Sequence, residues 1–110
     1  MVLSYNKVMF PPEQSHKVAE AWAKWLKDNP PDPSIEKTIC VGVRSTEDGM
    51  ALAIGIGDVA KGKAKEALVR NTAQNLFIAG KVPGLRYKAE IMLDVSEAFK
   101  LLGMTAPEKY

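Results

Sequence analysis

Two glycines one residue apart, Gly55 and Gly57, are the first residues in this sequence whose spacing could do chemistry. With Ala60 they match the G-x-G-x-x-G/A pattern of a loop that cradles a dinucleotide pyrophosphate, after an apolar run and before an expected helix. That motif also needs an acidic residue about 20 positions further on, but position 77 is Phe. Lysines at 61, 63 and 65 could hold an anion at the helix N-terminus, although solvated lysines are the simpler interpretation. The glycines are better explained as part of a strand.

Arg44, Lys88 and Glu90 form a second candidate site, because strand alternation predicts that all three point to one sheet face. Arg44 and Lys88 could bind a carboxylate or phosphate, and Glu90 is a candidate proton acceptor if it is desolvated. Asn6 is a further candidate ligand-binding residue and Ser4 could join it, although the first strand alternates poorly and could face either way. An ordinary set of charges at a sheet edge or dimer interface is the alternative.

The remaining reactive or aromatic side chains favour structural roles. His16, the one histidine, falls in the first turn of a helix without convergent partners, so we expect it to be exposed. Cys40, the one cysteine, excludes an internal disulfide, and we expect a buried, inert thiol within a sheet face. Trp22 and Trp25 share helical spacing with Val18, which indicates core packing. With no Cys/His cluster in the sequence, we predict neither a metal nor a cofactor.

The composition is that of a single globular domain over residues 1–110. The chain is 46% hydrophobic and 25% charged, and its formal net charge of +2 is too mild to argue for nucleic acid or an anionic membrane. No apolar run approaches the roughly 18 residues that span a bilayer. The N-terminus also lacks a signal-peptide pattern. We therefore expect a cytoplasmic protein.

Periodicity and turn residues predict the elements that would position these side chains. Strands are expected over 2–10, 37–45, 50–57 and 85–95, and helices over 13–29, from 58 or 59 to 79, and over 96–102. Leu68, Thr72, Leu76 and Ala79 mark the expected core face of the second helix. The order β-α-β-β-α-β predicts a ferredoxin-like α+β sandwich, with two helices on one face of a four-stranded antiparallel sheet, plus a short C-terminal helix. We expect residues 104–110 to be a mobile tail.

Asp48-Gly49 predicts a two-residue hairpin turn, which sets a register for its two strands. In that register small residues lie opposite small ones and large opposite large: Gly42 with Gly55, Cys40 with Gly57, Val43 with Ile54, and Val41 with Ile56. The Val/Ile face would lie under the helices and the Cys/Gly/Ala face would be open. Such a face lets a second sheet approach closely, so we expect a homodimer through the open face, with a cavity between the sheets.

A family resemblance rests on the element order and on two stretches, PPEQSHKVAEAWAKWL (11–26) and GDVAKGKAKEAL (57–68). Over about residues 1–103 the chain resembles small uncharacterised members of the dimeric α+β barrel superfamily of ferredoxin-like proteins. That superfamily includes cofactor-independent monooxygenases, haem-degrading enzymes and lactone isomerases. The haem-degrading branch has an asparagine on its first strand, matched here by Asn6. It also needs a histidine on the second long helix and a nearby tryptophan, which residues 66–80 lack.

Two functions are compatible with these observations. The first is a homodimeric, non-enzymatic module that binds a small, organic acid-like ligand between its sheets. The second is a small cofactor-independent enzyme, of the oxygenase or isomerase type, acting in the same cavity. Nucleic-acid binding is less favoured, because ALAIGIG (51–57) offers no aromatic side chain to stack a base.

Overall fold

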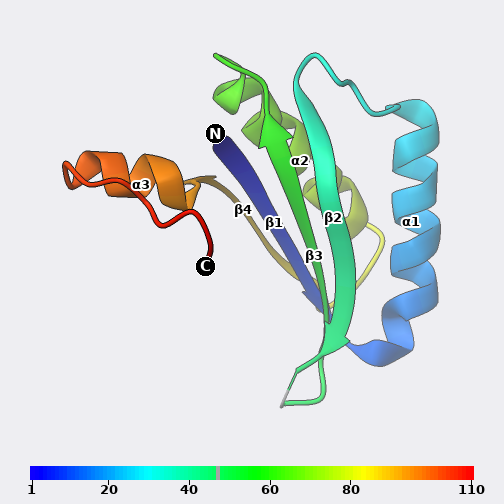
Figure 1. Ribbon diagram of the computed structural model, residues 1–110. Coiled ribbons are helices and arrows are strands. Elements are labelled where there is room, and N and C mark those ends of the chain that lie inside the picture. Colours follow the sequence, from blue (N-terminus) through cyan, green and yellow to red (C-terminus); the bar gives the residue numbers. More distant parts are fainter. Residues whose placement is uncertain (47) are drawn as a thin grey trace.

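The computed structural model describes residues 1–46 and 48–110. Its strands are β1 (Val2–Phe10), β2 (Glu36–Ser45), β3 (Ala51–Val59) and β4 (Arg86–Leu93); its helices are α1 (Ser15–Asp28), α2 (Ala64–Ala79) and α3 (Val95–Leu101), with a 3₁₀ turn, η1, at Pro12–Gln14. The strands form one antiparallel sheet in the order β2-β3-β1-β4. The helices α1 and α2 lie on one side of the sheet, and α3 projects away on the other side (Figure 1). This is the ferredoxin-like arrangement that the element order predicts.

Local sequence explains where the two long helices begin and end. Proline cannot continue a helix, and α1 ends at Asp28, shortly before Pro30. The helix α2 begins at Ala64, later than the expected start at 58 or 59, because β3 continues through Val59. Gly62 then turns the chain at a φ of +77°, which an L-residue with a side chain rarely adopts.

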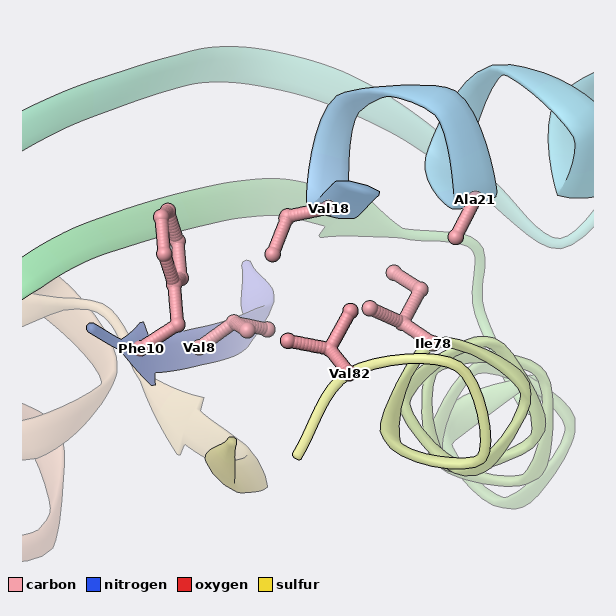
Figure 2. Packing of buried hydrophobic residues seen from close by; sticks show 6 residues of the cluster. All are labelled: Val8, Phe10, Val18, Ala21, Ile78 and Val82. Atoms are coloured by element: carbon pink, nitrogen blue, oxygen red, sulfur yellow. The ribbon is translucent and has the colours of Figure 1, made fainter. Parts of the chain in front are cut away.

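The hydrophobic core lies where β1, α1 and the end of α2 meet (Figure 2). It consists of six buried side chains: Val8, Phe10, Val18, Ala21, Ile78 and Val82. Trp25 and Phe77 add a contact between the two helices, with 5.9 Å between ring centroids. Because α1 packs chiefly on α2 rather than on the sheet, the core covers only part of the helix-facing surface of the sheet.

The helix α2 turns a different side to the sheet than the sequence predicts. Its buried residues are Ala67, Asn75 and Ile78, whereas Leu68 and Leu76 are exposed. The reason is a reciprocal amide pair: Asn6 Nδ2 donates to Asn75 Oδ1 at 3.1 Å, and Asn75 Nδ2 donates to Asn6 Oδ1 at 2.6 Å. Asn75 is fully buried, so this pair sets the rotation of α2 at the cost of exposing leucines.

The register of β2 and β3 differs by one residue from the predicted register. The backbone N–H of Thr46 donates to the carbonyl of Met50 at 2.7 Å, so the hairpin closes around a longer loop than the predicted two-residue turn. The pairing is therefore Val43 with Ala53, Gly42 with Ile54, Val41 with Gly55 and Cys40 with Ile56. A slip of one residue exchanges the faces of a strand. The Gly/Ala side of β3 consequently faces the helices, and the prediction that it is the open side is wrong.

A β-bulge at Ile39 reverses the alternation of β2. Thr38 pairs with Gly57 while Cys40 pairs with Ile56, which leaves Ile39 as an extra residue. As a result Thr38 and Glu36 point to the helix-facing side, as Val41 and Val43 do. No turn or glycine signal in β2 marks this bulge in the sequence.

The open face of the sheet is mainly apolar on its two central strands, with two charged residues among the apolar ones. Alternation from the observed register places Leu3, Tyr5, Met9, Leu52, Ile54 and Ile56 on this face, together with Lys7 opposite Ile54 and Asp58 opposite Leu3. The Cα radius of gyration is 15.5 Å, against about 13 Å for a compact chain of this length. Among residues 1–46 and 48–110, no helix has both the length and the apolar character to cross a membrane.

Candidate ligand cavity

A cavity of about 420 Å³ lies between the sheet and the helices. It is lined by side chains from β1, β2 and β3 on one side and from α1 and α2 on the other, and it adjoins the core at Phe10, Val18 and Ile78. The cavity exists because α1 stands on α2 and leaves the β2–β3 half of the sheet uncovered. Val41 and Val43, which point toward it, are accordingly 52% and 69% exposed.

The sheet surface beneath the cavity consists of small residues of β3. Ala53, Gly55 and Gly57 all line it. A Cβ atom added at Gly55 would have Val41 Cγ2 as its nearest neighbour, at 4.0 Å, so the space above this glycine is free of protein atoms. Backbone exposed in a strand interior often marks a place where another group approaches closely. Here the free space lies on the helix-facing side of the sheet, within a single chain.

The walls of the cavity are mostly apolar. Trp22 and Leu26 of α1 face the sheet-side valines Val41 and Val43 across it. Trp22 is 39% exposed, so it borders the cavity rather than filling the core as the sequence predicts. Apolar walls with a few polar groups are typical of small-molecule sites.

The polar end of the cavity is a carboxylate–hydroxyl pair. Ser4 Oγ donates to Glu36 Oε2 at 2.5 Å, and Ser4 is 3% exposed. A Cβ atom at position 57 would lie 2.5 Å from Glu36 Oε2 and 2.7 Å from Ser4 Oγ, so Gly57 is required for this pair to form as it does. A buried serine and a glycine from the two central strands thus hold the edge-strand carboxylate in place.

Two other charged residues at the cavity hold the loop after α1. Arg70 Nη2 donates to the carbonyls of Asn29 and Pro30 at 2.6 and 2.8 Å. Asp32 Oδ1 accepts from the hydroxyl and backbone N–H of Ser34, and these bonds lower the pKa of Asp32 below its ordinary value. Arg70 and Asp32 therefore already serve to fix the loop that closes the cavity.

Comparison with solved structures identifies the fold. The designed protein Foldit4 matches with a TM-score of 0.54 at 10% identity, over 84% of this chain and 97% of that one. The C-terminal domain of MgtC from Mycobacterium tuberculosis matches with a TM-score of 0.50 at 8% identity, over 82% and 88%. A chain from Caulobacter crescentus CB15, provisionally described as an antibiotic biosynthesis monooxygenase, has a TM-score of 0.46 at 14% identity, over 83% and 87%.

The fold is ferredoxin-like. The predicted fold class, a four-stranded antiparallel sheet with two helices on one face, is thereby confirmed. No family model matches the chain, and no curated protein matches it in sequence. Identities of this size concern the fold alone, so the function has to be argued from the site.

The structure divides the four predicted ligand residues between two faces. Arg44, Lys88 and Glu90 point to the open face as expected, whereas Asn6 points to the helices and lines the cavity. Lys88 Nζ and Glu90 Oε1 are 2.6 Å apart, and this hydrogen bond raises the pKa of Lys88. Arg44 lies on β2, at the other edge of the sheet, about 14 Å away if three strand spacings are counted. Arg44 cannot join the Lys88–Glu90 pair within one chain.

The predictions for histidine and cysteine have opposite outcomes. His16 is exposed, as expected, with its Nε2 atom 3.3 Å from Glu20. Cys40 is exposed rather than buried, because it lies on β2, one of the two edge strands of this sheet. Within the described ranges, no group of three or more His, Cys, Asp or Glu residues could hold a metal ion.

Glu36 is the polar residue that sequence reasoning missed. The expected strand began at Lys37, so Glu36 was not assigned to a face, and the bulge at Ile39 then decides that it points inward. The available signal was Gly57, whose lack of a side chain next to a serine-bearing strand indicates that another group occupies the space.

Proposed function

We propose that this protein binds a small, largely apolar molecule in the cavity between its sheet and its helices. The observation that carries the proposal is a space of about 420 Å³ above Ala53, Gly55 and Gly57, within the range of roughly 300–1,000 Å³ usual for ligand pockets. The space is open to solvent on one side, where Val41 and Val43 are 52% and 69% exposed, so a ligand can enter it without opening the core. The side chains around it are mostly apolar, with polar groups that include Ser15 of α1, Asn71 and Gln74 of α2, and the Ser4–Glu36 pair.

The site is proposed on the side of the helices rather than between the sheets of a dimer. Small residues were the reason to expect room between two sheets, and the observed register puts two of them, Gly55 and Gly57, on the helix-facing side. The open face carries leucine, isoleucine and methionine instead. This arrangement supports a ligand held by each chain on its own.

The open face is better suited to self-association, and we keep the homodimer as part of the proposal. Its mainly apolar centre on β1 and β3, interrupted by Lys7, is flanked by Arg44 on β2 and by Lys88 and Glu90 on β4. An apolar centre with a charged rim is the usual anatomy of a protein interface. The helix α3 projects on the same side, with Leu101 and Leu102 exposed (Figure 1).

A small cofactor-independent enzyme was the alternative, and the geometry does not favour it. Its candidate groups were Arg44, Lys88 and Glu90, and a general base needs convergent partners. The first of these residues lies at one sheet edge and the other two at the opposite edge.

Filling the cavity tests the proposal. The variant Gly55→Leu places a side chain in the free space, whereas Gly42→Leu adds the same side chain on the opposite face of β2, where nothing lies within 4 Å. Titration with 1-octanol, followed by the emission of the cavity residue Trp22 in a Trp25→Phe background, should show saturable binding in the parent and in Gly42→Leu. Gly55→Leu should not bind. Equal binding by all three proteins would overturn the proposal.

A further inference from the structure

We infer that the ligand of this cavity carries a protonated amine, which binds the carboxylate of Glu36. The inference rests on the proposed function, because it concerns the same cavity. It adds the chemical class of the ligand: an amphipathic amine, with an apolar body against the valine and tryptophan walls and an ammonium group at the polar end.

Three local features direct the carboxylate of Glu36 inward. The bulge at Ile39 reverses the alternation of β2, so that Glu36 shares a face with Val41. Gly57 leaves the space that the carboxylate occupies, and Ser4 donates a hydrogen bond to it at 2.5 Å. Bulges occur preferentially beside functional sites, where they re-aim a side chain. Without this bulge Glu36 would point to the open face with the other charged residues.

The chemistry of this end of the cavity is that of an acceptor. Glu36 Oε2 takes the hydroxyl proton of Ser4, and among the described residues no hydrogen bond reaches Oε1. Ser4, having donated its proton, has acceptor capacity left. A ligand group that fits here has to donate hydrogen bonds, and a protonated amine has three N–H donors.

The net charge of the residues that line the cavity also favours a cationic ligand. The ionisable residues that line the cavity are Asp32, Glu36 and Arg70, which sum to one net negative charge. Arg70 is hydrogen-bonded to backbone carbonyls and Asp32 to Ser34, so Glu36 is the charge that still lacks a counterion among the lining residues. An amine restores neutrality when bound, whereas an organic acid would place a second carboxylate beside the first.

Three ligands of equal chain length test the inference at pH 7: octylamine, 1-octanol and octanoate. Isothermal titration, read together with Trp22 emission, should give octylamine an affinity at least about tenfold above that of octanoate, the size of one charge-assisted hydrogen bond. Glu36→Gln should abolish the preference. The matched control Glu90→Gln removes a carboxylate from the opposite face and should leave the preference unchanged.

The outcomes separate this inference from the proposed function. If no ligand binds, or if Gly55→Leu binds all three as well as the parent, the cavity itself is not a site and both fail. If Gly55→Leu blocks binding but octanoate binds as well as octylamine, only the amine inference fails. Ser4→Ala guards against misfolding of Glu36→Gln, because it keeps the charge and frees the carboxylate; the amine preference should persist in this variant, and its loss would contradict the inference.

Discussion

The two faces of this sheet differ in the size of the side chains that its central strand β3 presents to them. On β3 the helix-facing positions are Ala51, Ala53, Gly55 and Gly57, and the open-face positions between them are Leu52, Ile54, Ile56 and Asp58. The small set leaves a cavity under the helices. The large set forms much of the open face, with Leu52 buried and Ile54 and Ile56 partly exposed. Because side chains alternate along β3, its small residues border the proposed ligand cavity and its large residues lie on the face proposed for self-association.

The pairing register between β2 and β3 decides which side chains of β3 face the helices. Both faces were visible in the sequence as a small set and a large set, and which set meets the helices depends on one residue in the hairpin loop. The observed loop reverses the expected assignment for β3, so that Gly55 and Gly57 face the helices, while Arg44, Lys88 and Glu90 stay on the open face.

The largest expected effect is on assembly, and it tests the open face. Ile56→Glu places a charge between Tyr5 and Cys40 on the open face, where burying it against a second sheet would cost far more than the contact gains. We expect the dimer to become monomeric, as measured by light scattering at micromolar concentration. Val69→Glu, on the exposed side of α2, is the control and should stay dimeric. A monomeric parent protein would end the assignment of this face to self-association.

On the other face, the buried amide pair should dominate stability. Asn75→Ala leaves the Asn6 amide without its partner and creates a small void, so we expect the free energy of unfolding to fall by about 2–3 kcal/mol. Urea denaturation measures this loss. Asn71→Ala, on the same helix but only partly buried, should change stability by less than about 0.5 kcal/mol. Similar losses for both variants would mean that the pair does not fix the rotation of α2.

Two glycines on the same face should respond with opposite signs. Gly55→Ala meets only a contact at 4.0 Å, so it should stabilise the protein by about 0.5 kcal/mol through reduced freedom of the unfolded chain. Gly57→Ala displaces the Ser4–Glu36 pair and should destabilise by about 1 kcal/mol. Thermal unfolding of the two variants side by side is the measurement. Equal shifts would show that position 57 has no special need for glycine.

Features of the fold that depend on residues close together in the sequence could be predicted, and features that depend on distant residues could not. The strands, the element order and the end of α1 follow from alternation and proline, which are local signals. The face of α2 does not, because Asn75 is oriented by Asn6, 69 residues earlier in the chain. Leucines at helical spacing indicated an apolar face there, and a long-range pair of amides outweighed them.

The candidate site was missed for a related reason. Glu90 and Glu36 are equally good carboxylates in the sequence, and Glu90 stood in the clearer alternating strand. A bulge and a one-residue loop difference decide which carboxylate faces a cavity, and both are set by pairing between strands rather than by the residues themselves. Gly55 and Gly57 correctly indicated that space is needed next to β3, but the sequence did not show on which face of the sheet that space lies.

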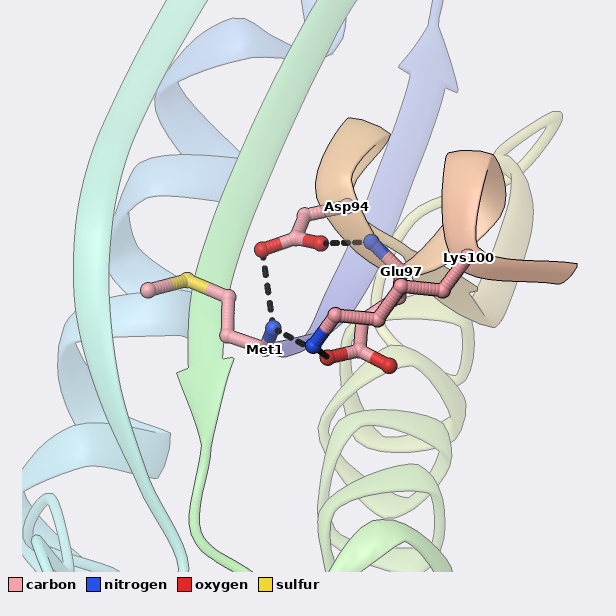
Figure 3. Close-up of polar contacts among 4 residues, drawn as sticks. All are labelled: Met1, Asp94, Glu97 and Lys100. Carbon is pink, nitrogen blue, oxygen red and sulfur yellow. Dashed lines mark hydrogen bonds and ion pairs between the residues drawn. The ribbon is translucent and has the colours of Figure 1, made fainter. Parts of the chain in front are cut away.

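The smallest expected effect concerns the attachment of α3 to the sheet (Figure 3). The Met1 amino group lies 2.8 Å from Asp94 Oδ2, and Asp94 Oδ1 accepts the backbone N–H of Glu97 at 2.9 Å, which makes Asp94 the N-cap of α3. The bond from the amino group, then that from Glu97, lowers the pKa of Asp94 below its ordinary 3.8. The same contact with Asp94 raises the pKa of the amino group above 8.0.

A carboxyl group with a lowered pKa stabilises the folded state above its unfolded pKa, and the stabilisation is lost as the pH falls through the folded value. The helical Cα chemical shifts of Ala98 and Phe99 should therefore decline below about pH 4. Asp94→Asn keeps a capping oxygen but cannot titrate, so its profile should be flat across this range. The amino group has the opposite sign, and its contribution should fade above pH 8 as it loses its proton. An unchanged acid profile in Asp94→Asn would place the titrating group elsewhere and leave α3 held by its apolar contacts alone.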